Sequence, residues 1–451
     1  MPSPVRSAVA PLYLFMCLIL GGSTQGIWAN AVLQLIGIAI IAWALLDHRS
    51  PLPDTARPIL LLAIAAAFIV TLQLIPIPAS FSANGVRGRI AEGFRLLGLP
   101  APALPTTVTP YESLSAFFCL IPPLAIFSAI VRLNAYRRSW LAAALLGATL
   151  LGILLGALQV ATSGAGPRWY PYDQTNLGLG VGFFANANHM ATLLVISIPF
   201  LAAIVSSARS NNLQRYSALL SIMAAMALLV VVGIALNGSL AGYTLAVPAI
   251  AASVILILPK QNRIRIWLGG AAAIFAVAAV GAIASSSIGV GKIGADANVS
   301  IVSREQILRT TGQAIGDFMP LGSGLGSFAK VYRLYERPDS VTSEWVIHAH
   351  NDYAELALEL GVAGVLLAAL FLAWWVSRVR AVWQEGEGGP FAMAASIASA
   401  AVLVHSLVDF PLRTAAISAC FAMCVALLAD RKTPVREEVA DLRPTRHVVI
   451  R

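Results

Sequence analysis

Long apolar stretches alternate with short polar connections along most of this 451-residue chain. A helix that crosses a hydrocarbon core of roughly 30 Å needs about 20 consecutive apolar residues. The pattern therefore predicts an all-α, polytopic membrane protein with about twelve transmembrane helices. The expected helices are 9–22, 27–46, 58–76, 112–131, 139–160, 188–206, 216–236, 239–258, 266–285, 353–376, 391–408 and 413–430.

One long polar stretch, residues 287–352, interrupts this pattern and is called the polar segment below. It divides the chain into four parts: an N-terminal bundle of about nine helices (1–286), the polar segment with candidate site residues, the C-terminal helices (353–430) and a basic tail (431–451). Histidines and arginines gather in this segment. Charged side chains at a membrane boundary usually mark a functional site.

Composition supports the membrane assignment, and the positions of the basic residues predict the orientation of the chain in the membrane. The chain is 58% hydrophobic and 11% charged, against roughly 25% charged residues in soluble domains. The net charge of +9 comes from basic residues at the ends of apolar runs, which argues against nucleic-acid binding. Basic connections fall on one side if both termini are cytoplasmic, so we expect the polar segment to face the periplasm of a bacterial inner membrane.

This orientation limits the chemistry that the polar segment can carry out. Nucleotide sugars and ATP are cytoplasmic, so a periplasmic site has no direct access to them. Any transfer reaction there must use an activated group already attached to something in the membrane. The glycines around Gly322 and Gly324 are accordingly not a dinucleotide motif, and they predict close approach of the backbone to a helix or to a phosphate.

His350 is the candidate general base. It lies at the end of the polar segment, beside Asn351 and Asp352 and directly before an apolar helix. An imidazole can take a proton from a hydroxyl group at neutral pH, as a general base must. His348 lies two residues earlier and is the alternative base, although the shorter distance to the helix favours His350.

Three carboxylates after His350 allow two interpretations. Asp352, Glu355 and Glu359 have the spacing of one helix face, so together with the His348-Ala-His350 pair they resemble a possible metal site. The preferred interpretation is that they cap the helix and pair with arginines of the polar segment. We therefore expect no metal and no other cofactor.

Arginines supply the expected phosphate contacts. A guanidinium is always charged and binds phosphate oxygens in a bidentate manner, and Arg304 is the favoured candidate. Arg309 follows five residues later, so the two need not face the same ligand in a helix. Near the C-terminus, His405 and Asp409 lie at i, i+4 and are followed by Arg413. We expect these three to pair with each other or with the polar segment.

Several short motifs together resemble the O-antigen ligase and O-antigen polymerase (Wzy-type) family of bacterial envelope proteins. They are Leu72-Gln73-Leu-Ile-Pro76-Ile-Pro78, Asn186-Ala-Asn188-His189, Gly322-Ser-Gly-Leu-Gly-Ser-Phe328, His350-Asn351-Asp352-Tyr353 with Glu359-Leu-Gly361, and His405-Ser-Leu-Val-Asp409-Phe-Pro411. The His-Asn-Asp-Tyr block is the most specific of them.

The resemblance implies a metal-independent membrane glycosyltransferase of the GT-C type. Such enzymes move a glycan from a polyprenyl diphosphate to an acceptor hydroxyl on a glycan, on lipid A core or on a protein, within the bilayer and in some cases with other polysaccharide assembly proteins. His350 would be the base. Donor or glycan contacts would be Arg304, Arg309, His348, Asn351, Asp352 and Tyr353. Supporting residues that contact these would be Asn188, His189, Glu359, His405, Asp409 and Arg413.

One departure from the family pattern bears on the reaction. The family usually shows Ser-Arg at the outer start of a helix, whereas this chain has Ser239-Leu240. A second diphosphate arginine is therefore missing, and Arg309 or Arg413 is the candidate substitute. The difference favours polymerase-like chemistry over ligation. A flippase or transporter, or a non-catalytic partner of a polysaccharide assembly complex, is the alternative function.

Overall fold

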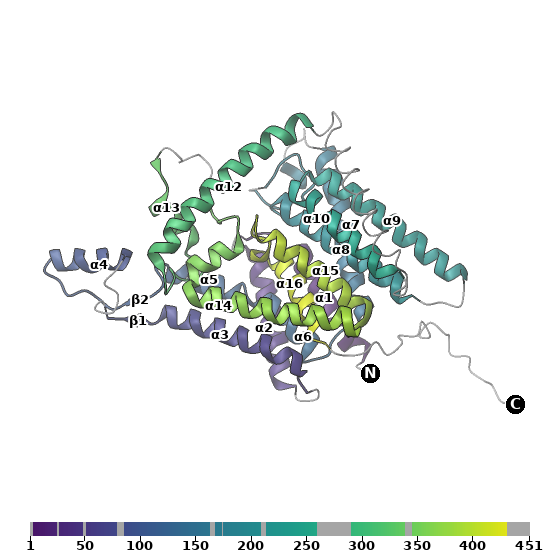
Figure 1. Cartoon of the computed structure of the whole chain (residues 1–451), viewed down its shortest axis with the longest axis horizontal. Coiled ribbons are helices and arrows are strands. Elements are labelled where there is room, and N and C mark those ends of the chain that lie inside the picture. Colours follow the sequence, from purple (N-terminus) through teal and green to yellow (C-terminus); the bar gives the residue numbers. More distant parts are fainter. Residues whose placement is uncertain are drawn as a thin grey trace.

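The computed structural model describes residues 3–24, 27–47, 51–78, 85–162, 167–173, 175–208, 213–258, 290–338 and 345–430. Regular structure in these ranges is almost entirely helical (Figure 1). The helices are α1 (Pro4–Leu20), α2 (Trp28–Leu46), α3 (Arg57–Leu74), α4 (Gly85–Leu96), α5 (Pro110–Phe118), α6 (Ile121–Val131), α7 (Arg138–Ala161), α8 (Ala187–Ser207), α9 (Leu213–Asn237), α10 (Leu240–Ile257), α12 (Val290–Phe318), α13 (Phe328–Tyr335), α14 (Asp352–Arg380), α15 (Gly389–His405) and α16 (Ala415–Ala429).

Short elements complete the chain. The 3-10 turns are η1 (Asp54–Ala56), η4 (Pro167–Trp169) and η7 (Pro411–Arg413), and a π-helical turn, η6 (Ala381–Glu385), follows α14. Strands β1 (Pro76–Ile77) and β2 (Leu104–Pro105) pair antiparallel, with Pro76 opposite Pro105. This ribbon carries α4 beyond the end of the bundle (Figure 1).

The prediction of an all-α, multi-pass membrane protein is confirmed. Eight helical stretches among the described residues are long and apolar enough to cross a bilayer, and α1, α15 and α16 are shorter apolar helices. The expected helix 266–285 lies outside the described residues, so the count of twelve stays a prediction. The expected helix 112–131 is divided into α5 and α6, where Pro122 and Pro123 open the second helix because proline supplies no backbone donor.

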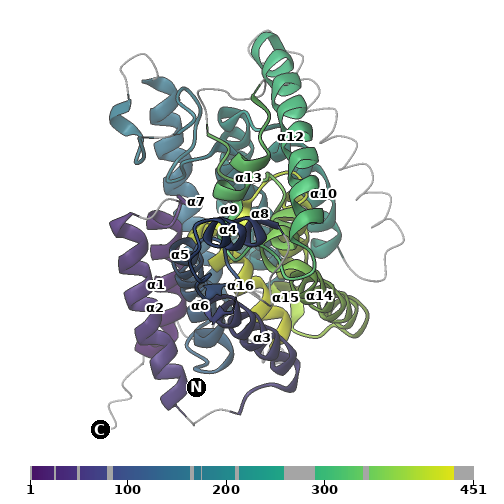
Figure 2. The same ribbon diagram turned by 90° about the vertical axis from the view of Figure 1, so that its left-hand side faces the viewer.

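Helix α8 lies at the centre of the bundle. It is the most buried of the eight candidate spans and packs against α7, α9, α10 and α15 (Figure 2). Helix α16 packs against α6, α15 and α1. Alanines dominate α15 and α16, and small side chains let helices approach closely where lipid offers no hydrophobic driving force. This core holds the helix ends that carry the candidate site.

The polar segment is mostly helical, which the sequence analysis did not foresee. Helix α12 runs beside the first part of α14, and α13 follows it (Figure 1). Ile307, Thr311 and Ala314 are buried on one face of α12. Their i, i+4, i+7 spacing is the pattern of an amphipathic helix. That spacing was the available signal, and the surrounding polar residues obscured it.

Helix α14 changes direction at Gly361. This residue has φ 61° and ψ −145°, outside the helical region, and an added Cβ would clash with the carbonyl of Pro320. Glycine alone adopts such angles readily. The kink places the first turns of α14, which carry the three carboxylates, against the glycine-rich turn that precedes α13.

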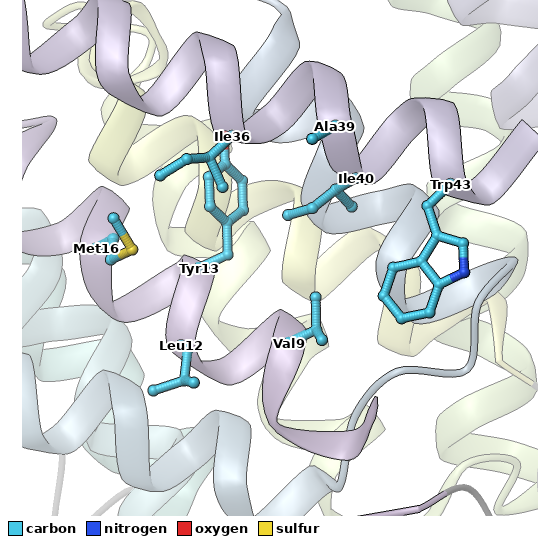
Figure 3. A pocket seen from close by; sticks show the side chains of 8 residues that line it. All are labelled: Val9, Leu12, Tyr13, Met16, Ile36, Ala39, Ile40 and Trp43. Atoms are coloured by element: carbon cyan, nitrogen blue, oxygen red, sulfur yellow. The ribbon is translucent and has the colours of Figure 1, made fainter. Parts of the chain in front are cut away.

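One described cavity lies away from these polar residues. It is a groove of about 310 Å³ between α1 and α2, lined by Val9, Leu12, Tyr13, Met16, Ile36, Ala39, Ile40 and Trp43 (Figure 3). The Tyr13 hydroxyl donates a hydrogen bond to the Leu33 carbonyl. The lining is otherwise apolar, as expected for helices that face lipid, and it offers no group for acid-base chemistry.

Candidate active site

Asp409 lies at the centre of the candidate site. It is fully buried in the turn between α15 and η7. Its Oδ1 accepts hydrogen bonds from His350 Nδ1 at 3.1 Å and from the Phe410 backbone N–H at 2.9 Å. Its Oδ2 accepts from Asn188 Nδ2 at 2.5 Å. Both oxygens are therefore held by donors, as a buried carboxylate requires.

The charge of Asp409 is preserved despite its burial. Burial opposes ionisation of the carboxyl, but the hydrogen bond and charge of His350, with further contributions from His189 and His405, outweigh it. The pKa of Asp409 is held well below its usual range as a result. The site thus contains a permanent negative charge beside the candidate base.

His350 is presented by an unusual backbone conformation. Its φ of 50° lies in the left-handed region, which few residues other than glycine adopt. The next two residues fasten this turn to the end of α15: Asn351 Nδ2 donates to the Leu407 carbonyl at 2.9 Å, and the Asp352 N–H donates to the Ser406 carbonyl at 2.9 Å. These contacts hold the strained backbone that places the imidazole against Asp409.

The hydrogen bond to Asp409 also determines which ring nitrogen of His350 is available. An ionised carboxylate only accepts hydrogen bonds, so Nδ1 must carry the hydrogen. The other nitrogen, Nε2, is then the atom that accepts a proton. The side chain is 28% exposed, so the imidazole is partly accessible. A buried carboxylate that fixes an imidazole in this way is the arrangement of an acid-base pair.

Arg304 brings a positive charge to the same carboxylate. Its Nη2 lies 3.7 Å from Asp409 Oδ2, and its side chain is 28% exposed. The separation is that of an ion pair and exceeds hydrogen-bonding distance. Arg304 therefore neutralises Asp409 while its guanidinium remains open to solvent and to an anionic ligand.

Three histidines contact the ring of Phe410, and a fourth lies near Asp409. Ring centroids of His189, His348 and His350 lie 5.0, 4.2 and 5.0 Å from that of Phe410. His405 Nδ1 bonds the Thr192 hydroxyl at 2.7 Å, and its Nε2 is 3.9 Å from Asp409 Oδ2. His405 and Asp409, which their spacing predicted to pair, thus lie close together but beyond hydrogen-bonding distance. These four are all the histidines of the described ranges.

A second charged cluster lies beside the first. Arg413 approaches Asp352 at 3.6 Å, Glu355 at 3.3 Å and Glu359 at 3.1 Å. The three carboxylates share one face of α14, as their spacing predicted, but their partner is Arg413 and not an arginine of the polar segment. Burial alone would lower the pKa of Arg413, and the three carboxylates raise it well above its usual range.

His348 belongs to this second cluster. Its Nδ1 lies 2.9 Å from Glu355 Oε1, and the Ala349 N–H donates to Glu355 Oε2 at 3.0 Å. The side chain is 15% exposed, about half the value for His350. The structure therefore places the two alternative bases in different surroundings, with the more accessible one against Asp409.

Other predicted contact residues occupy structural positions. The Tyr353 hydroxyl donates to the Leu403 carbonyl, and the Asn351 side chain caps α14 by accepting from the Ala354 N–H. Arg309 is largely exposed and pairs with Glu305 at 2.6 Å. The structure does not bring Arg309 together with Asp409. Substrate contact by these residues stays a prediction.

The glycine-rich turn packs against a helix. Gly322 has φ 80°, and an added Cβ would clash with the Glu359 carbonyl. The Ser323 and Gly324 N–H groups donate to the carbonyls of Leu358 and Glu359 at 2.9 Å each. Of the two expected roles for these glycines, close approach to a helix is the one that the contacts support. The glycines thereby hold the carboxylate face of α14 in position.

Within the described ranges, no group of three or more His, Cys, Asp or Glu residues is arranged to hold a metal ion. The four cysteines are free thiols. The arrangement around Asp409 is instead suited to proton transfer beside an anion.

Comparison with known families gives one match. Residues 225–369 match the model of the O-antigen ligase family. The match supports the O-antigen ligase and polymerase family. It confirms the resemblance seen in the short motifs and indicates a membrane glycosyl-transfer function in envelope polysaccharide assembly. A search of curated proteins found none that matches the chain.

The matched segment contains only part of the candidate site. It includes Arg304, His348 and His350, whereas Asn188 and Asp409 lie outside it. The carboxylate that holds the candidate base therefore comes from a C-terminal segment beyond the matched residues, and the amide that holds this carboxylate comes from α8.

Proposed function

We propose that this protein transfers a glycan from a polyprenyl diphosphate carrier to an acceptor hydroxyl at the periplasmic face of the bacterial inner membrane. The observation that carries the proposal is the His350–Asp409 pair with Arg304 on the same carboxylate. A base and a phosphate-binding cation are the two groups that this reaction needs beside each other. The O-antigen ligase match supports the class of reaction.

The proposed reaction is a single displacement at the anomeric carbon. The acceptor oxygen forms a bond to this carbon while the bond from the carbon to the diphosphate oxygen breaks, with inversion. His350 Nε2 takes the hydroxyl proton, and Asp409 stabilises the imidazolium that forms. Arg304 stabilises the negative charge that develops on the departing polyprenyl diphosphate. No metal is needed for these steps, because the side chains supply both the base and the cation.

The absence of a second arginine at Leu240 makes polymerisation the favoured variant of this reaction. Leu240 is 47% exposed at the start of α10, so it adds apolar surface where the family usually has a cation. Both candidate substitutes have carboxylate partners in the structure, since Arg309 pairs with Glu305 and Arg413 lies among three carboxylates. One arginine would therefore carry most of the diphosphate stabilisation.

The first test compares the two alternative bases in a strain that lacks the gene. The strain is complemented with wild type, His350→Gln or His348→Gln, and surface glycan is separated by size on a gel. We expect His350→Gln to accumulate single repeat units or unligated glycan, because loss of a general base costs roughly 10²–10⁴-fold in rate. His348→Gln should give a clearly smaller loss.

Protein levels in the membrane serve as the control, since both variants must be present at wild-type amounts. An unchanged glycan ladder in His350→Gln would contradict the assignment of the base and favour a transporter or a non-catalytic assembly partner. A greater loss in His348→Gln than in His350→Gln would transfer the role to His348.

A further inference from the structure

The side-chain amide of Asn188 connects the start of α10 to Asp409. The Ser239 hydroxyl donates to Asn188 Oδ1 at 2.6 Å, and Asn188 Nδ2 donates to Asp409 Oδ2 at 2.5 Å. The orientation of the amide follows from the chemistry, because an ionised carboxylate only accepts hydrogen bonds. Ser239 is itself fixed as the cap of α10, where its hydroxyl accepts from the Gly242 N–H.

The two oxygens of Asp409 have different partners, and the Asn188 amide holds the oxygen that His350 does not contact. Oδ1 holds His350, whereas Oδ2 has Asn188 as its only short side-chain contact in the described ranges. The other groups near Oδ2 are Arg304 at 3.7 Å and His405 at 3.9 Å, both beyond hydrogen-bonding distance. Without the amide, the carboxylate plane could rotate about its Cβ–Cγ bond.

We propose that Asn188, oriented by Ser239, is a positioning residue that fixes the plane of Asp409 and thereby the direction of His350 Nε2. This inference rests on the proposed function and adds to it a chain of four side chains that begins at the cap of α10. Some residues hydrogen-bond to a catalytic group without touching the substrate. Their removal typically lowers activity by about 10–100-fold. Asn188 and Ser239 make no contact with the acceptor in this scheme.

Several charged or titratable groups surround the same carboxylate and enter any pH experiment. They are His350 before α14, His189 on α8, His405 at the end of α15 and Arg304 on α12. All of them are unchanged in the variants proposed here. A difference in pH dependence between wild type and a variant at position 188 therefore reports on the new group at that position.

The experiment uses the full-length protein in lipid nanodiscs. The donor is the lipid-linked glycan extracted from membranes of the deletion strain, with total membrane lipid of that strain as acceptor, and the readout is release of polyprenyl diphosphate. We expect Asn188→Ala to lower kcat by about 10–100-fold with little change in KM for the donor. Ser239→Ala should lower kcat less, and Ser239→Thr, which retains a hydroxyl, should recover much of the loss.

Asn188→Asp provides a test that a purely structural role would not affect. This variant has almost the same shape but places a second carboxyl against Asp409. Two adjacent carboxyls share a proton, and the shared proton supplies the donor that the amide had provided. Activity of Asn188→Asp should fall as the shared proton leaves, so its optimum moves to lower pH by about one unit or more.

Gln159→Ala is the matched control. Gln159 is a fully buried amide on α7 whose partners are the backbone groups of Trp169, Val181 and Gly182. Its loss should lower thermal stability and leave kcat of the folded protein and its pH profile unchanged. This separates general loosening of the bundle from the specific effect at Asp409.

The outcomes are distinguishable. If wild type transfers glycan, His350→Gln does not, and both variants of Asn188 keep the wild-type kcat and pH profile, the positioning role is wrong and the proposed function stands. If wild type releases no polyprenyl diphosphate, or His350→Gln releases it at the wild-type rate, the proposed function itself fails. An equal loss of kcat in Gln159→Ala and Asn188→Ala, with no shift in Asn188→Asp, would also overturn the inference.

Discussion

Two charged clusters lie side by side in this protein, and they differ in how their charges are paired. In the Arg413 cluster, a cation whose side chain is 20% exposed lies among Asp352, Glu355 and Glu359. In the Asp409 cluster, one carboxylate holds His350 and Arg304, and both of these side chains are 28% exposed. Phe410 separates the two, with His348 and His350 against its ring.

The difference shows how the same residue types can serve stability or chemistry. A cation that lies among three carboxylates joins α14 to the turn before α16. A carboxylate that holds one nitrogen of an accessible imidazole leaves the other nitrogen able to react. The pairing of the charges, more than their presence, distinguishes a structural cluster from a candidate active site.

The largest expected effect concerns the Arg413 cluster. Arg413→Ala would leave three carboxylates without their cation, and breaking a buried ion pair costs about 3–5 kcal/mol of unfolding free energy. We expect a lower thermal unfolding midpoint in detergent and less folded protein in the membrane. Arg413→Lys is the control, because it retains the charge and should lose less. A stable, normally expressed Arg413→Ala protein would show that the cluster is not structural.

A smaller effect, on activity alone, is expected at the Asp409 cluster. Arg304→Ala should reduce kcat by about 10²–10³-fold, as loss of a transition-state charge contact does. The unfolding midpoint should stay near that of wild type, because Asp409 keeps its hydrogen bonds from His350 and Asn188. Arg304→Lys should recover part of the activity.

Release of polyprenyl diphosphate and thermal unfolding, measured on the same Arg304 samples, separate the two effects. Arg309→Ala is a comparison for a surface arginine of the same helix. If Arg304→Ala loses stability and activity in parallel, the distinction between the clusters does not hold.

The smallest effect is the dependence of stability on acid. The pKa of Asp409 is lower in the folded protein than the value of about 3.9 for an unfolded chain. Its ionised form therefore stabilises the fold at neutral pH, and this contribution is lost as the pH falls below about 4. The amide in an Asp409→Asn protein cannot titrate, so the unfolding midpoint of this variant should decline less between about pH 6 and pH 3 than that of wild type. Equal declines would contradict this account.

Much of the fold follows from the apolar pattern. Stretches of about 20 apolar residues predict membrane helices because the bilayer allows few other conformations. The same pattern did not predict α12, because its buried positions Ile307, Thr311 and Ala314 are spaced among polar residues. The pattern also did not predict the kink at Gly361, because this kink depends on contact with the turn at Pro320.

The sequence by itself determined the membrane character of the chain, its polar segment and the presence of a histidine directly before a helix, because these depend on residues close together along the chain. Only the tertiary structure decided which groups surround that histidine. Asn188, Arg304, His350 and Asp409 lie on four separate segments. No local pattern reports their distances, since the packing of α8, α12, α14 and α15 brings them together.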